Sequence, residues 1–224
     1  MENSSILKNF LISLMHYIKN FINIKNHIYN LNPLVNLIVV TKNQSIDKLK
    51  MLIENKQLHF GENRVQEAIQ KWKIIKDHSP DLKFHLIGKL QSNKAKEAFN
   101  FFDYIHSLDS EKLAQILHKL ESNSTKRMKY FIQVNIGSET QKSGIAIDNV
   151  DAFIKLCIFD LKLNVIGLMC IPPAISNVDH YFKSLLQIAS RNNLKELSMG
   201  MSNDYEIAIK YSATYVRIGS AIFN

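Results

Sequence analysis

The sequence predicts a single α/β domain folded as a (β/α)₈ barrel of the TIM type, with a helix packed on it at the N-terminus. Eight short apolar runs alternate along the chain with segments of helical periodicity. The 224 residues, 46% hydrophobic and 21% charged, suffice for one sizeable core. A doubly wound open sheet is the alternative, because it uses the same right-handed βα units.

The first half of the chain supplies four predicted strands, each followed by a helix. The strands are the runs 34–42, 58–63, 84–88 and 104–108. Ser45, Ser92 and Ser110 precede three of the helices, and we expect their hydroxyls to accept hydrogen bonds from first-turn N–H groups. The apolar faces of the four helices include Leu49 and Leu52, Ala68 and Trp72, Ala95 and Phe99, and Leu113 and Leu120.

The second half repeats the pattern. The predicted strands are 130–136, 165–171, 196–200 and 215–219. Pro172 and Pro173 end the second of these, because proline cannot donate to a strand ladder. Helical periodicity returns around 150–157 and 178–189, and a short helix is expected over 202–211.

Residues 1–33 are predicted to form a helical segment packed on the barrel of residues 34–224, so that the chain is one domain overall. The apolar residues at helical spacing are Leu7, Phe10, Leu11, Leu14, Ile18, Phe21 and Ile22. Lys8, His16, Lys19 and Lys25 interrupt them before a membrane span is reached. Binding of this helix to a membrane surface is the alternative.

Charge and cysteine content indicate a cytoplasmic protein without a nucleic-acid partner. The net charge is +8, but the basic residues are scattered in ones and twos, which favours a solvated surface over a polyanion site. Cys157 and Cys170 are the only cysteines, so neither a disulfide scaffold nor a zinc site is indicated. The histidines form no pair at ligand spacing, and we predict no metal.

Lys42 closes the first predicted strand. In barrels of this type the reactive groups come from the carboxyl ends of strands. An amine that is partly desolvated there can attack an aldehyde and form an imine. The alternative is a lysine that simply leaves the strand for solvent.

Two loops near the C-terminus carry the groups that a phosphate needs. Ser198, Gly200 and Ser202 lie in SMGMSND, and Gly219 and Ser220 lie in VRIGSAIF. Such loops at helix N-termini offer hydroxyls and close backbone N–H groups to an anion. Since strand one of a barrel neighbours strand eight, the loops and the strand-one lysine would share one rim. The sequence therefore predicts a site for pyridoxal 5'-phosphate.

Three more side chains are candidates for the pyridine ring. Arg217 shares a strand face with Gly219 and can donate to an unprotonated ring nitrogen, or it pairs with Glu62 or another carboxylate. Asn63 can bond the phenolate oxygen or a neighbouring side chain. His85 either lines the floor under the ring or is a hydrogen-bonded core group.

The chain resembles the pyridoxal phosphate homeostasis proteins, also called the YggS or proline synthase co-transcribed homologue family. The resemblance spans residues 35 to 223. Its motifs, in the family's order, are VVTK, HFGENRVQE, FHLIGKLQSNK, FIQVNI with QKSGI, GLMCIPP, LSMGMSND and VRIGSAIF. Here Arg64 replaces the usual aromatic residue, Thr41 a serine and Ser220 a threonine.

The resemblance implies a barrel like the N-terminal domain of alanine racemase, with pyridoxal 5'-phosphate held as an imine on Lys42. It implies a protein that buffers and supplies this cofactor, with cofactor-requiring apoenzymes as candidate partners, and we expect a monomer. No catalytic residue is predicted, because related racemases take a tyrosine from another domain. The alternative is a racemase or lyase of low activity that recruits Tyr104, His85 or a dimer partner.

Overall fold

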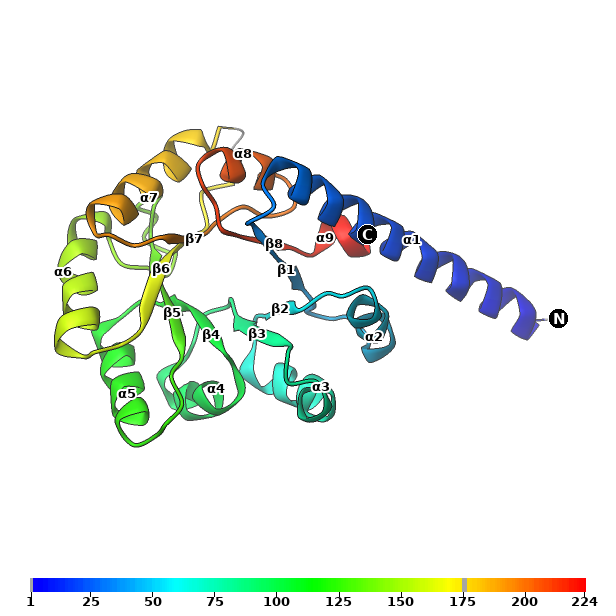
Figure 1. Ribbon diagram of the computed structural model, residues 1–224, viewed down its shortest axis with the longest axis horizontal. Coiled ribbons are helices and arrows are strands. Elements are labelled where there is room, and N and C mark those ends of the chain that lie inside the picture. The colour runs from blue at the N-terminus through cyan, green and yellow to red at the C-terminus, as the bar shows by residue number, and fades with distance from the viewer. Residues whose placement is uncertain (1, 175–176) are drawn as a thin grey trace.

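The computed structural model is a closed barrel of parallel strands, and it describes residues 2–174 and 177–224 (Figure 1). The strands follow chain order around the barrel, and β1 closes it by pairing with β8. The predicted barrel is thus confirmed, and the open-sheet alternative is wrong because the two end strands are hydrogen-bonded to each other. The strands are β1 Asn36–Val40, β2 His59–Glu62, β3 Lys83–Leu86, β4 Tyr104–Leu108, β5 Lys129–Val134, β6 Val165–Cys170, β7 Glu196–Ser198 and β8 Tyr215–Ile218.

Helices follow the strands and cover the outside of the barrel (Figure 1). Strand and helix bounds differ from the sequence prediction by a few residues, and two differences near the C-terminus bear on the site. The helix expected from residue 202 begins three residues later, after a turn, and a short helix that was not predicted follows β8. The helices are α2 Ile46–Glu54, α3 Val65–His78, α4 Ala95–Phe101, α5 Glu111–Ser122, α6 Val150–Lys155, α7 Asp179–Arg191, α8 Tyr205–Lys210 and α9 Ser220–Phe223.

The predicted N-caps have different outcomes. The Ser110 hydroxyl accepts from the backbone N–H of Leu113 at 3.4 Å, as expected. Ser45 occupies the N-cap position of α2, but its side chain makes no capping hydrogen bond. The prediction for Ser92 is wrong, because this residue lies inside a 3₁₀ turn (Ser92–Lys94) that precedes α4.

Strand side chains alternate between two cores, as the two-residue period of a strand requires. Val39 and Val216 point outward into the large core between strands and helices. Their neighbours Ile38 and Tyr215 point into the barrel, where they pack with Phe131 in a separate small core. By the same alternation, buried histidine, serine and arginine side chains point into the barrel below its carboxyl rim.

The N-terminal helix α1 (Glu2–Leu31) lies against α9, α8 and α2 (Figure 1). Tyr17, Phe21 and Ile28 are buried on one face of it, since they recur about one or two turns apart. Ile22, predicted on this face, is 39% exposed. The division at residues 33 and 34 stays a prediction. The predicted positions of Leu7, Phe10, Leu11 and Leu14 concern side chains outside the described ones.

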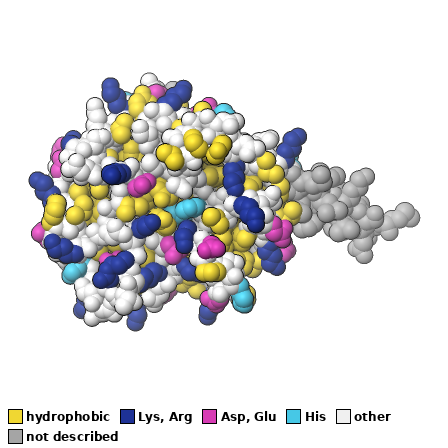
Figure 2. Space-filling view, in the orientation of Figure 1, with side chains coloured by type: hydrophobic (Ala, Val, Ile, Leu, Met, Phe, Trp, Pro, Cys, Tyr) yellow, Lys and Arg dark blue, Asp and Glu magenta, His cyan; other side chains and the backbone are white. Residues whose placement is uncertain are grey.

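Within the described residues, no helix combines the length and the apolar character that crossing a membrane requires. Basic side chains are spread among acidic and apolar ones on the face that Figure 2 shows, and do not gather in one patch there.

Candidate cofactor-binding site

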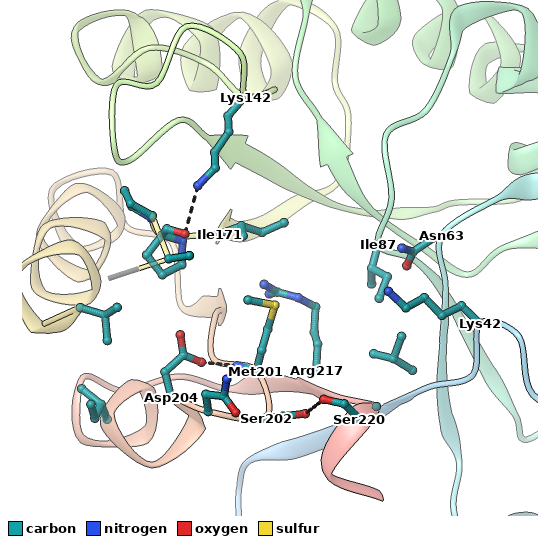
Figure 3. A pocket seen from close by; sticks show the side chains of 18 residues that line it. Lys42, Asn63, Ile87, Lys142, Ile171, Met201, Ser202, Asp204, Arg217 and Ser220 are labelled. Carbon is teal, nitrogen blue, oxygen red and sulfur yellow. Dashed lines mark hydrogen bonds between the residues drawn. The ribbon is translucent and has the colours of Figure 1, made fainter. Parts of the chain in front are cut away.

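A pocket of about 840 Å³ opens at the carboxyl ends of the strands (Figure 3). Six of the nine residues predicted from the sequence line it, and they come from both ends of the chain. His85, Ser198 and Gly200 are not part of the lining. The six lining residues are Lys42, Asn63, Ser202, Arg217, Gly219 and Ser220.

Lys42 stands at the rim, two residues after β1 ends. Its side chain is exposed and reaches into the pocket beside Asn63 and Ile87 (Figure 3). The preceding residue, Thr41, is buried, and its backbone N–H donates to the carbonyl of Gly61 at 3.0 Å. Lys42 therefore presents an exposed side chain on a backbone that hydrogen bonds hold in place.

Glu62 holds this part of the rim together from below. Its Oε1 accepts from the Thr41 hydroxyl at 2.6 Å and from the Trp72 indole N–H at 2.8 Å. Lys71 lies 2.7 Å from the same oxygen and also donates to the Thr41 carbonyl at 2.6 Å. The suggested pairing of Arg217 with Glu62 is wrong, because Glu62 is paired with Lys71.

We expect Glu62→Ala to lower the free energy of unfolding by about 3 to 5 kcal/mol, because it leaves a largely buried cation without its partner. Urea denaturation measures the change. Glu67→Ala is the matched control, since Glu67 pairs with Arg64 on the exposed surface and should cost less than about 1 kcal/mol. Equal losses for the two variants would contradict the anchoring role.

The loops after β7 and β8 are joined by their serines. The Ser220 hydroxyl donates to Ser202 Oγ at 2.9 Å, which also accepts from the Ala221 N–H at 3.2 Å (Figure 3). A Cβ on Gly219 would come within 3.1 Å of the Val40 carbonyl oxygen, so this loop lies directly against the end of β1. The two hydroxyls and the strand-one lysine thus share one rim, as the closure of the barrel predicts.

Gly200 shapes the first of these loops without lining the pocket. Its φ is +92°, and a Cβ there would lie 2.6 Å from the Cβ of Ala208. The loop does not enter a helix directly, because α8 begins only at Tyr205. Asp204 Oδ1 instead accepts from the Met201 N–H at 2.5 Å. The expectation of a helix N-terminus at this loop is therefore wrong, while the short α9 does begin at Ser220.

Arg217 is 4% exposed and forms part of the pocket wall. It donates from Nη1 to Ser198 Oγ at 2.7 Å and from Nη2 to the Cys170 carbonyl at 2.9 Å. Burial lowers the pKa of the guanidinium, and nearby Cys170 and Asp204 oppose that shift. Its partners are neutral oxygens, and a guanidinium has five N–H donors, so donors remain for an acceptor in the pocket. An unprotonated pyridine nitrogen fits this site.

His85 lies inside the barrel and is fully buried. Its Nε2 lies 2.9 Å from His59 Nδ1, and its Nδ1 lies 2.9 Å from His106 Nε2. Its ring also stacks on Tyr104 with centroids 4.1 Å apart. The structure therefore places His85 among hydrogen-bonded core groups instead of on the pocket floor. No group of three metal-binding side chains occurs in the described residues.

Sequence reasoning missed Lys142, which lies across the pocket from Lys42 (Figure 3). It comes from the loop after β5, donates to the Pro172 carbonyl at 3.2 Å and pairs with Glu139. Its position in a loop at the carboxyl end of a strand could have indicated a pocket residue, because barrel sites are built from such loops. A second cation therefore faces the same pocket.

Comparisons with known proteins identify the family of this chain. The family model for the alanine racemase N-terminal domain matches residues 12–224. A pyridoxal phosphate homeostasis protein of Aquifex aeolicus is 38% identical over 73% of this chain and 75% of its own length. The counterpart in Vibrio alginolyticus is 35% identical over 84% of this chain and 85% of its own.

Solved structures show the same architecture. PipY of Synechococcus elongatus without PLP superposes with a TM-score of 0.85 at 34% identity, covering 92% of this chain and 99% of PipY. PipY with PLP bound gives 0.80, covering 93% and 100%. Alanine racemase of Bartonella henselae, at 14% identity, gives 0.74 over 93% of this chain and 58% of the racemase, which shows the shared fold alone.

The fold and the rim lysine define a barrel of the class formed by the N-terminal domain of alanine racemase. Within that class, the chain belongs to the pyridoxal phosphate homeostasis protein family.

Proposed function

We propose that this chain binds pyridoxal 5'-phosphate reversibly on Lys42 and takes part in its homeostasis by buffering and supplying it. The observation that carries the proposal is the shared pocket of Lys42, the joined Ser202 and Ser220 loops, and a buried Arg217 that has no carboxylate partner among the described side chains. Relatives named pyridoxal phosphate homeostasis proteins, and PipY with PLP bound, support it.

Each group of the pocket has one task in this proposal. The cofactor, when bound, would supply an aldehyde that can form a C=N bond with an amine, the aldehyde oxygen leaving as water. Lys42 provides the amine, and Ser202 with Ser220 and the Gly219 backbone hold the phosphate. Arg217 would donate to the ring nitrogen and so favour its unprotonated form, in which the ring is a weak electron sink. Asn63 lies beside Lys42, where it can bond the phenolate oxygen.

The experiment that tests this function is borohydride reduction of the loaded protein followed by peptide mapping. Reduction converts the C=N bond into a stable amine and leaves the label on the lysine that formed it. We expect one labelled peptide, containing Lys42. Absence of label, or label only on peptides without Lys42, would overturn the proposal.

Recognition of the phosphate predicts a large difference between two ligands. We expect pyridoxal to bind about 100-fold more weakly than its phosphate ester, since charge-assisted hydrogen bonds to phosphate contribute about 1.5 to 3 kcal/mol each. Absorbance titration of both ligands measures this ratio. Ser202→Ala combined with Ser220→Ala should narrow the ratio, and equal affinities of the unmodified protein would contradict the phosphate loops.

We propose that the protein carries the cofactor and does not catalyse a reaction with it. Tyr104 and His85, the candidate acid/base groups, point into the barrel and do not line the pocket. Hydrogen exchange at the α-carbon of several amino acids tests the racemase or lyase alternative. Rapid exchange that disappears in Lys42→Ala would contradict a carrier.

We also propose a cytoplasmic monomer whose partners are cofactor-requiring apoenzymes, without a nucleic-acid or membrane partner. Both cysteines are buried free thiols, and burial raises the pKa of each to about 12, which suits a reducing compartment. The scattered basic side chains of Figure 2 fit a protein without a polyanion site.

A further inference from the structure

Three histidines inside the barrel form an unbroken line of hydrogen bonds, which we call the histidine chain (His59, His85 and His106). Their ring nitrogens are 2.9 Å apart at both junctions. At its upper end, His106 Nδ1 lies 2.8 Å from Ser198 Oγ, which accepts from Arg217 at 2.7 Å. The line thus connects the pocket wall on β8 with the first residue of β2.

The donors and acceptors of this line point in one direction. Arg217 can only donate, so it uses Ser198 as an acceptor. Ser198 is fully buried, and His106 Nδ1 is the acceptor within reach of its hydroxyl hydrogen among the described residues. If His106 donated instead, that hydrogen would be buried without a partner, which costs free energy.

The same assignment propagates along the chain. With Nδ1 accepting from Ser198, neutral His106 carries its hydrogen on Nε2 and donates to His85 Nδ1. His85 then carries its hydrogen on Nε2 and donates to His59 Nδ1. All three rings are therefore neutral and bear hydrogen on Nε2, with their acceptor sides toward Arg217.

We propose that the histidine chain positions Arg217 through Ser198 for the ring nitrogen of the bound ligand, without pairing its charge with a carboxylate. The part concerning the ligand rests on the function proposed above. A carboxylate partner would neutralise this buried charge, whereas aligned neutral dipoles stabilise it and leave its remaining donors free.

The surroundings of the chain support neutral rings. Burial lowers the pKa of His59 to about 4, and Lys83 and Lys129 act in the same direction while Asp103 opposes them. Burial also lowers the pKa of His85 and His106 well below the usual value, with Arg217 acting further on His106. The line does not carry protons to the pocket, because a guanidinium does not give up its proton in a protein.

The direct test is ¹⁵N NMR of histidine-labelled, ligand-free protein near neutral pH, with His85 and His106 assigned by single substitutions. Long-range ¹H–¹⁵N correlations distinguish the two nitrogens of a ring. We expect both rings to be neutral with hydrogen on Nε2. A charged ring, or hydrogen on Nδ1 of either residue, would overturn the proposal whether or not the protein binds the cofactor.

The second test compares two interior variants. His106→Phe preserves a ring beside Phe131, whose centroid is 4.3 Å from that of His106, but it cannot accept from Ser198. We expect about tenfold weaker binding of pyridoxal 5'-phosphate, because the buried Ser198 hydroxyl loses its acceptor. We also expect an altered absorption spectrum of the bound form. His106→Gln, which can both accept and donate, should restore part of the affinity.

Phe131→Leu is the matched control, because Phe131 lies in the same interior core outside the hydrogen-bonded line. We expect its affinity and spectrum to match the unmodified protein. Equal losses in Phe131→Leu and His106→Phe, or no loss in either, would overturn the positioning role. Failure of the proposed function is a separate result, since it would leave Lys42 of the unmodified protein unlabelled after reduction.

Discussion

Lys42→Ala is expected to abolish the label that borohydride reduction leaves on the protein. It should also weaken binding of pyridoxal 5'-phosphate by at least about 100-fold, because the covalent link is lost and only noncovalent contacts remain. The remaining contacts, from Arg217 and the two serine loops, lie on other elements and are unaffected. The measurements are absorbance titration and mass spectrometry of the reduced protein.

The matched control is Lys89→Ala, because Lys89 is an exposed lysine of the same rim that does not line the pocket. It should bind and label like the unmodified protein. Label that persists at the same level in Lys42→Ala, for example on Lys142 across the pocket, would show that Lys42 is not the essential amine.

The parts of the site that could be predicted from the sequence lie at the ends of regular elements. Lys42 follows an apolar run, and Ser202 and Ser220 lie in turns that follow two other runs. Local periodicity locates these strand ends, and the closure of a barrel brings the first beside the last. Six residues far apart in the chain could therefore be assigned to one pocket.

The contacts that hold those residues could not be predicted, because they join elements that no local pattern relates. Glu62 was a plausible partner for Arg217, yet it forms an ion pair with Lys71 of α3, the helix that follows β2. From the sequence, His85 is a lone histidine in an apolar run, which fits either the pocket floor or the barrel core. Only the adjacent strands show that it lies between His59 and His106. The helix α8 begins later than predicted, because residues 201–204 form a turn in which Asp204 Oδ1 accepts from the Met201 N–H.

Neutral buried histidines make the barrel sensitive to acid. A histidine whose pKa is lowered by folding binds fewer protons in the native state than in the unfolded state between the two values. Stability therefore rises with pH across that window, and the contribution is complete above about pH 6.5, the unfolded value. It is lost as the pH falls toward the folded value, which is about 4 for His59.

We expect the free energy of unfolding to fall steeply between pH 7 and pH 5, where carboxylates titrate little. His59 alone accounts for about 2 kcal/mol between pH 6.5 and pH 5, and His85 and His106 act in the same direction. Urea denaturation at several pH values measures the slope. His59→Gln should flatten it, whereas His78→Asn, a change at an exposed histidine, should not. A native state equally stable at pH 7 and pH 5 would mean that these rings accept protons without cost, which contradicts the burial of His85 and His106 and the lowered pKa of all three rings.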